Sequence, residues 1–240
     1  MANVQCVVPL AGPDFVGKDG RIKALQLLDG VPLLQRTLMT RPWIQQGQLA
    51  WSDLTFVLLD SDVTRHFAKT HLQSWFPKSQ TCFISDVTQG AAMSALSGLS
   101  QCRDFNAPLC VDLADILYDA DVDPVADFEQ NPELGGLALT FRSDWPLYSY
   151  LEIDRDGAMI SAREKVVISE TASAGTYFFR SAADYATALA YLIRNRIDLA
   201  YRDLLFVCPL LNGLVDAGLR VEVRNVKNVV DIKSGSPVIM

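Results

Sequence analysis

Residues 4–39 read VQCVVPLAGPDFVGKDGRIKALQLLDGVPLLQRTLM, and this stretch decides the fold class. The apolar run 4–10 predicts a buried strand that ends at Gly12. A polar stretch that contains Lys23 follows, and Pro32 predicts the first turn of a helix. A buried strand that leads into a small-residue loop with cations is how α/β proteins hold phosphates, because backbone N–H groups must approach the anion and Lys or Arg must balance its charge.

The loop after this strand lacks the two best-known phosphate motifs. It contains no GxxxxGK[ST] and no GxGxxG. An ordinary strand-to-helix loop with solvated lysines therefore stays open as an alternative interpretation of this stretch.

The composition excludes several protein classes. The chain has 240 residues, of which 50% are hydrophobic, so we expect a single domain over residues 1–240. The net charge of −7 argues against a general nucleic-acid binder, which needs a basic footprint. The five cysteines form no CxxC pair, which favours free thiols in a reducing compartment. No signal-peptide pattern or membrane-spanning apolar run is present, so we expect a cytoplasmic protein without membrane partners.

Strands and helices alternate through the first half of the chain. Residues 54–59, 81–86 and 108–112 are short apolar runs that predict further buried strands. His66 and His71 lie five residues apart on the helix predicted between the first two of these runs, which does not suit a two-histidine metal site. We therefore predict a mixed, mainly parallel sheet with helices on both faces.

Antiparallel strands are expected after residue 135. The segment TFRSDWPLYSYLEIDRDGAMISAREK, residues 140–165, alternates around Asp156-Gly157, which is a strong hairpin signal. The hairpin would return Glu164 and Lys165 over the sheet. Residues 174–179 predict a buried strand that begins with a close backbone approach at Gly175.

Together these motifs resemble the sugar-phosphate nucleotidyltransferases, in a short form without a C-terminal acyltransferase extension. Lys23 would match the lysine of the family's KPL, and residues 30–32 its GxP. The segment 140–165 follows the family's pattern TFKSxxPxYSYxExDxxGxVxxxxEK without a gap, and 206–218 resemble its xVxPxxNxLIxxG. One departure is clear, since Gly12-Pro13-Asp14-Phe15 replaces the glycine-rich turn and its arginine.

The resemblance implies a nucleotide-diphospho-sugar transferase fold and a set of site residues. It implies that Lys23 holds phosphates. The implied nucleotide-binding residues are Leu10, Ala11, Gly12, Gln89, Gly90 and Ala91, and the implied substrate-binding residues are Glu164, Lys165, Gly175 and Asn212.

Aspartates close two of the predicted strands, and the family places Mg²⁺-binding aspartates at such positions. The segment Asp112-Leu113-Ala114-Asp115 leaves the first ligand open. If Asp112 matches the family's asparagine, Ala114 falls on the metal position; if the strand is shifted, Asp112 or Asp115 can serve. Asp231 matches the second metal aspartate. If the strands that end at Asp112 and Asp231 are both parallel neighbours of the first, their carboxyl ends meet beside Gly12.

The resemblance implies an enzyme that joins a nucleoside triphosphate to a sugar 1-phosphate or a similar phosphorylated small molecule and releases pyrophosphate, with Mg²⁺ as cofactor. The catalytic residues would be Lys23, Asp112 and Asp231. The altered glycine loop also permits a catalytically weak relative that binds a nucleotide or a sugar nucleotide as a sensor or partner subunit. A glycosyltransferase on the same fold is a third hypothesis. A homo-oligomer is possible in each case.

Overall fold

The computed structural model describes residues 4–231 and 236–237. Its strands are β1 (Gln5–Pro9), β2 (Leu27–Leu28), β3 (Val31–Pro32), β4 (Leu54–Leu59), β5 (Gln80–Ile84), β6 (Leu109–Asp112), β7 (Ile116–Asp119), β8 (Leu134–Arg142), β9 (Ser149–Ile153), β10 (Met159–Glu164), β11 (Thr171–Phe179), β12 (Arg220–Asn225), β13 (Lys227–Asp231) and β14 (Ser236–Pro237). The helices are α1 (Leu33–Met39), α2 (Pro42–Gln45), α3 (Asp62–Phe67), α4 (Gln73–Trp75), α5 (Ala91–Leu99), α6 (Pro124–Gln130), α7 (Ala182–Arg194), α8 (Arg196–Leu199), α9 (Val207–Leu210) and α10 (Asn212–Asp216).

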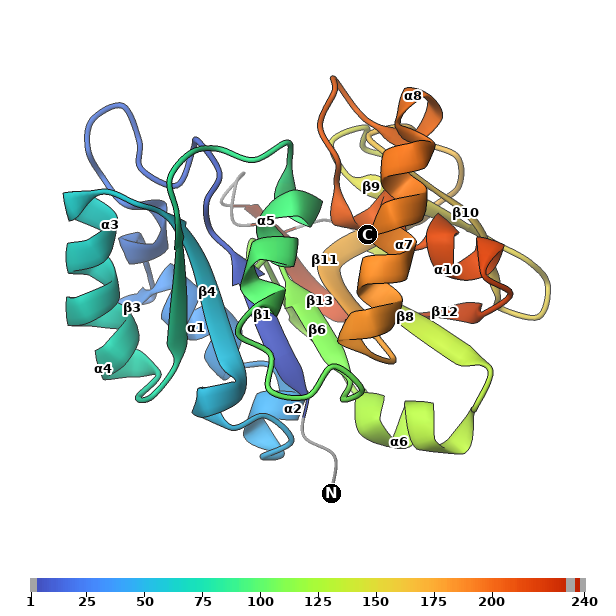
Figure 1. The fold of residues 1–240 in the computed structure, drawn as a ribbon, viewed down its shortest axis with the longest axis horizontal. Helices are drawn as coiled ribbons and strands as arrows, with labels where there is room; N and C mark the ends of the chain where they lie inside the picture. The colour runs from blue at the N-terminus through green and yellow to red at the C-terminus, as the bar shows by residue number, and fades with distance from the viewer. Residues whose placement is uncertain (1–3, 232–235, 238–240) are drawn as a thin grey trace.

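A nine-stranded mixed sheet forms the centre of the molecule (Figure 1). Strand β1 lies between β4 and β6 and is parallel to both, and β5 extends this parallel part beyond β4. On the other side β11 runs antiparallel to β6, and it also pairs with β8 and with the hairpin strand β9. The parallel strands therefore share one carboxyl edge, which is the upper edge in Figure 1.

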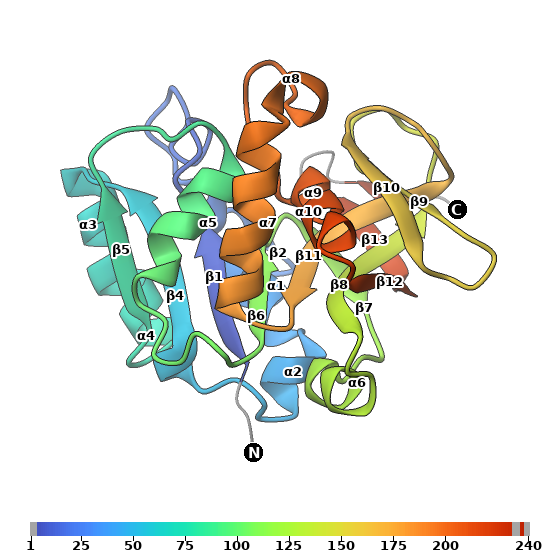
Figure 2. The same ribbon diagram turned by 45° about the vertical axis from the view of Figure 1, so that its right-hand side comes forward.

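The sheet separates two hydrophobic cores, because side chains alternate along its strands. In β1, Cys6 and Val8 belong to one core and Val7 to the other; in β4, Phe56 and Val57 divide in the same way. Helices α5 and α7 cover one face, as Figure 2 shows, and α1, α2 and α3 cover the other. The prediction of a mixed sheet with helices on both faces is confirmed.

The helix boundaries follow from capping residues in the sequence. Ser61 begins α3 with a capping box that includes Thr64, and Ser181 begins α7 by accepting a hydrogen bond from the Asp184 N–H. The single helix predicted after Ser61 is divided, since the five-residue π-helical segment 68–72 separates α3 from α4. Gly218, at φ +79°, follows the C-cap residue Ala217 of α10, in the left-handed conformation that commonly ends helices.

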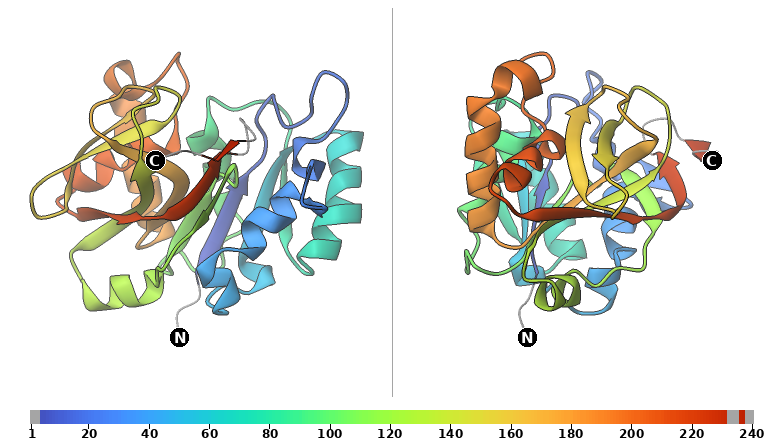
Figure 3. Two further views of the ribbon diagram at one scale, coloured as in Figure 1. Left: turned by 180° about the vertical axis from the view of Figure 1, so that it is seen from behind. Right: turned by 90° about the vertical axis from the view of Figure 1, so that its right-hand side faces the viewer.

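The final strands depart from the expected topology. Strand β12 pairs in parallel with β8, but β13 leaves the large sheet and pairs antiparallel with β7 (Figure 3). Asp231 therefore does not end a parallel neighbour of β1. The reason is that β4 and β6 already occupy both edges of β1, so the large sheet has no position beside β1 for a further strand.

The five cysteines are free thiols, as expected. Burial raises the pKa of the Cys110 and Cys208 thiols, which keeps them protonated and unreactive at neutral pH. None of the helices in residues 4–231 and 236–237 combines the length and the apolar character that a bilayer crossing requires.

Candidate functional site

A cavity of about 650 Å³ lies at the carboxyl edge of the parallel strands. Open α/β sheets bind their ligands at this edge. Segments that lie far apart in the sequence form its wall: the loop after β1, the turn before α5, the turn after β6, and two later loops. Its lining includes Leu10, Ala11, Gly12, Asp14, Phe15, Lys23, Gln89, Gly90, Ala91, Asp115, Lys165, Leu204 and Phe206.

Most of the residues implied by the resemblance meet in this cavity. The three loop residues 10–12, Lys23, the 89–91 turn, Asp115 and Lys165 all line it. The other implied residues with described side chains lie outside this lining: Asp112, Glu164, Gly175 and Asn212. The side chain of Asp231 lies outside the described part of the structure.

Lys23 is held at the base of the loop that follows β1. Its backbone N–H donates to the Phe15 carbonyl at 3.1 Å, and an isolated bridge between Val16 and Ile22 closes the loop above it. The Lys23 ammonium lies 3.5 Å from the Asp14 carboxylate. That ion pair is well exposed at Asp14, so solvent weakens it and an anionic ligand can compete for the lysine.

Gly90 lies where the 88–91 turn contacts the loop 201–206. The Leu205 N–H donates to the Gln89 carbonyl at 2.8 Å, and the Ala92 N–H donates to the Leu205 carbonyl at 3.1 Å. Gly90 has φ +105°, and a Cβ there would lie 2.3 Å from the Leu205 carbonyl oxygen. Only glycine permits this contact, so close packing against Leu205 explains the glycine at position 90.

We expect Gly90→Ala to destabilise the protein and weaken ligand binding at the cavity. The backbone strain costs about 1–3 kcal/mol, and the new Cβ must also displace Leu205. Gly47→Ala is a matched control, because Gly47 also has a positive φ, +72°, but nothing within 4 Å of a new Cβ. Urea unfolding and nucleotide titration of both variants measure the difference. Equal effects of the two substitutions would contradict the role of the Leu205 contact.

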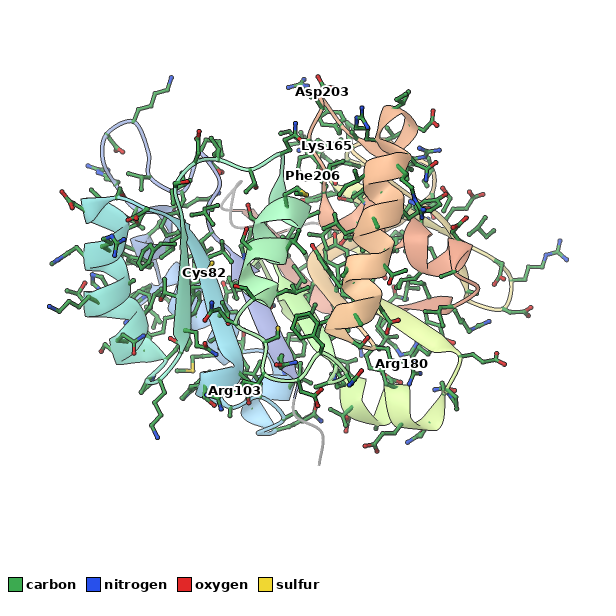
Figure 4. All side chains as sticks on the ribbon, viewed as in Figure 1. Cys82, Arg103, Lys165, Arg180, Asp203 and Phe206 are labelled. Carbon is green, nitrogen blue, oxygen red and sulfur yellow. The ribbon has the colours of Figure 1, made fainter. Side chains whose placement is uncertain are left out.

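Lys165 reaches the cavity from the end of the β9–β10 hairpin. It has φ +54°, and its ammonium lies 3.6 Å from the Glu164 carboxylate. The ammonium also lies 5.4 Å and 5.1 Å from the ring centroids of Tyr201 and Phe206. Figure 4 shows Lys165 and Phe206 at the same end of the molecule, above α5. The sequence pattern did not identify the two aromatic residues as neighbours of Lys165.

Glu164 and Asn212 have structural contacts. Glu164 is buried and accepts a hydrogen bond from the Ser149 hydroxyl. The Asn212 side chain accepts a hydrogen bond from the Ala162 N–H and donates one to the Ala162 carbonyl, each at 2.9 Å. These two bonds connect α10 to β10. Neither residue belongs to the cavity lining.

Asp115 lines the cavity on the turn after β6, and Gly175 makes room for it. Gly175 has φ +77°, and a Cβ there would lie 3.0 Å from the Asp115 Oδ1 atom. The Leu113 N–H donates to the Gly175 carbonyl at 2.9 Å, which holds the turn against β11. Gly175 thus shapes the site through the turn that carries Asp115, and it is not itself part of the lining.

Asp112 does not line the cavity, although its predicted metal-binding role would require it to do so. Its side chain is fully buried, and Arg41 donates to both carboxylate oxygens at 2.7 Å and 3.0 Å. The Asp112 oxygens are therefore engaged inside the protein, outside the cavity lining. Sequence reasoning did not identify Arg41, because no motif marks it and it lies far from Asp112 along the chain.

The backbone of Asp231 lies close to the turn that carries Asp115. The register of β13 and β7 places Asp231 opposite Ile116, the residue after Asp115. Among the described residues, no group of three or more His, Cys, Asp or Glu could hold a metal ion. Mg²⁺ does not need such a group, since it binds through one or two carboxylates and completes its shell with water and substrate phosphates. Asp115 lines the cavity, and the backbone of Asp231 lies opposite the residue that follows it.

Solved structures share this fold over nearly the whole chain. The nucleoside-diphosphate-sugar pyrophosphorylase of Vibrio cholerae RC9 is similar with a TM-score of 0.76 at 19% identity, over 95% of each chain. The inositol-1-phosphate CTP transferase of T. maritima has a TM-score of 0.69 at 15% identity, over 98% of this chain and 92% of that one. No protein-family model and no curated protein gives a significant match to the sequence. The resemblance found in the sequence is thus confirmed at the level of the fold: the chain has the nucleotide-diphospho-sugar transferase fold.

Proposed function

We propose that the protein is a nucleotidyltransferase that joins a nucleoside triphosphate to a sugar 1-phosphate or a similar phosphorylated small molecule. One observation carries the proposal: a single cavity brings together Lys23, the Gln89–Ala91 turn, Asp115 and Lys165 from four separate segments. The likeness to a nucleotide-sugar pyrophosphorylase and an inositol-1-phosphate CTP transferase supports this reaction class.

The charges along the cavity suit a triphosphate that carries a cation. Among the described lining residues, Lys23 and Lys165 are cationic, and Asp14 and Asp115 are anionic. This balance leaves no surplus positive charge for a bare triphosphate. We therefore propose that Asp115 and Asp231 hold Mg²⁺ together with the nucleotide. The ion would supply positive charge to the transferring phosphoryl group.

The protein's own side chains position the two reactants. Lys23 would hold the triphosphate, and Lys165, at the end of the β9–β10 hairpin, would hold the acceptor phosphate. An oxygen of the acceptor phosphate attacks the α-phosphorus, and a new P–O bond forms. The bond from the α-phosphorus to the bridging oxygen breaks, and its electron pair leaves with pyrophosphate. The lysines contribute by orientation and by stabilising the charge of the transferring and leaving groups.

We expect Lys23→Ala to weaken triphosphate binding by about 1.5–3 kcal/mol, the contribution of a charged hydrogen bond. The fold should be retained, because Lys23 is a partly exposed side chain outside the two cores. Arg21→Ala is the control, since Arg21 carries the same charge on the same loop but is 89% exposed and outside the cavity lining. Nucleotide titration measures both; an unchanged affinity in Lys23→Ala would make Lys23 a solvated loop residue.

The proposal is tested by incubating the protein with each of the four nucleoside triphosphates, Mg²⁺, and a panel of sugar 1-phosphates and phosphocholine. A transferase releases pyrophosphate only when a triphosphate and a matching acceptor are both present. A sensor would show nucleotide-dependent thermal stabilisation without pyrophosphate. A glycosyltransferase would consume a nucleotide sugar instead.

A further inference from the structure

A fully buried ion pair lies directly below the turn that carries Asp115. Arg41 Nε donates to Asp112 Oδ2 at 2.7 Å, and Arg41 Nη2 donates to Oδ1 at 3.0 Å. Both side chains have no exposed surface. The Arg41 guanidinium also stacks on the Tyr118 ring, 3.9 Å from its centroid. Arg41 lies between α1 and α2, which cover the face of the sheet opposite α5. The pair therefore joins this helical layer to the end of the central strand β6.

The pair is bonded to both ends of the turn. Asp112 Oδ1 accepts the Ala114 N–H at 2.8 Å, just before Asp115. Arg41 Nη2 donates to the Ile116 carbonyl at 3.2 Å, just after it. Ala114 itself has φ +52°, a left-handed conformation that a non-glycine residue adopts only when its surroundings impose it. The two contacts bracket Asp115 and account for this conformation.

Stability does not explain why this position carries charges. Taking two charges out of water costs free energy, and apolar residues of similar volume often replace a buried ion pair without loss. The cost is higher here, because Arg41 Nη1 is buried and has no hydrogen-bond partner among the described residues. What an apolar pair could not supply is the set of directed hydrogen bonds to the Ala114 N–H and the Ile116 carbonyl.

We propose that Arg41 and Asp112 are positioning residues that fix the 113–115 turn, so that the Asp115 carboxylate faces the nucleotide-bound cation in the cavity. This inference rests on the proposed function, in which Asp115 holds Mg²⁺ with the nucleotide. It assigns Asp112 a role through Asp115 in place of direct metal binding, and it assigns Arg41 a role that the sequence motifs do not suggest.

The test removes the ion pair without leaving a buried unpaired charge. In the double variant Arg41→Met with Asp112→Leu, we expect a melting temperature near or above that of the parent protein. Nucleotide affinity without Mg²⁺ should be unchanged. The gain in nucleotide affinity on adding Mg²⁺, read by calorimetric titration, should fall at least tenfold. The matched control is Arg224→Met with Asp127→Leu, which removes a 2.9 Å ion pair between β12 and α6, outside the cavity lining.

A second variant covers the case in which the double variant does not fold. Arg41→Lys retains the charge but not the planar fork, so one ammonium cannot hold both Asp112 oxygens and the Ile116 carbonyl in the same geometry. It should also reduce the Mg²⁺ effect on nucleotide affinity. A full Mg²⁺ effect in either folded variant would overturn the proposal.

The outcomes separate this inference from the proposed function. Parent protein that binds nucleotide with Mg²⁺ but releases no pyrophosphate contradicts the transferase, and a loss of the Mg²⁺ effect in the variants would still support the positioning role. Parent protein that releases pyrophosphate while both variants keep the Mg²⁺ effect supports the transferase and overturns the positioning role. Parent protein without any Mg²⁺ effect on nucleotide affinity overturns the positioning role, and pyrophosphate release then decides on the transferase separately.

Discussion

Asp115→Asn is expected to reduce pyrophosphate release by about 10²–10³-fold, the loss that follows removal of one group that stabilises transition-state charge. Asparagine has nearly the shape of aspartate, so the close contact with Gly175 can be retained. What disappears is the negative charge that faces the cavity. The protein should therefore unfold at the same temperature as the parent and lose the Mg²⁺-dependent part of its nucleotide affinity.

Asp86→Asn is the control for this substitution. Asp86 is another carboxylate just beyond a parallel strand, β5, but it is exposed and outside the lining of the large cavity. Pyrophosphate release is measured for both variants at saturating triphosphate, acceptor and Mg²⁺. Similar rates for Asp115→Asn and the parent protein would remove Asp115 from the mechanism.

Arg41→Ala should have the largest effect on stability, a loss of about 3–5 kcal/mol in the free energy of unfolding. The reason is that the Asp112 carboxylate would stay buried with its principal partner removed. Urea denaturation at neutral pH measures the loss. Because native proteins are in general only marginally stable, we expect this variant to be largely unfolded at physiological temperature.

Arg65→Ala is the matched control for burial. Arg65 pairs with Asp60 in the same two-bond geometry, at 2.5 Å and 2.7 Å, but both side chains are well exposed. Solvent screens such a pair, so its loss should change stability far less than the loss of Arg41. Equal losses in the two variants would show that burial does not set the importance of the Arg41–Asp112 pair.

The parallel centre of the fold could be predicted from local sequence. Four apolar runs become the parallel strands β1, β4, β5 and β6. Strands β1, β4 and β6 are buried on both faces, which requires continuous apolar residues, whereas β5 is a half-buried edge strand. Turn and cap chemistry was equally informative: Asp156-Gly157 joins β9 to β10, and Ser181 begins α7. These features depend on residues close together in the chain.

The course of β13 could not be predicted in the same way. Its alternating apolar residues indicate a strand but not its partner, and the partner proved to be β7 in a separate sheet. The choice depends on which strand edges earlier elements have already occupied. That information is tertiary and absent from the local pattern.

The candidate site shows the same division between local and tertiary information. The pattern DLAD placed two carboxylates at the end of β6, but it could not decide which one is exposed to the cavity. The decision depends on Arg41, which lies on another layer and buries Asp112. The contact between Gly90 and Leu205 was hidden for the same reason, although the glycine itself was identified.

The central claim is that the cavity joins two phosphorylated substrates through a new phosphoanhydride bond. Phosphorus-31 NMR of one reaction, with protein, Mg²⁺, the triphosphate that stabilises the protein most and its acceptor phosphate, tests it directly. We predict that the acceptor and triphosphate signals decrease together, while a nucleoside diphosphate ester and pyrophosphate accumulate in equal amounts. Unchanged substrate signals across the whole acceptor panel, with nucleotide binding intact, would contradict the transferase and favour a nucleotide-binding sensor.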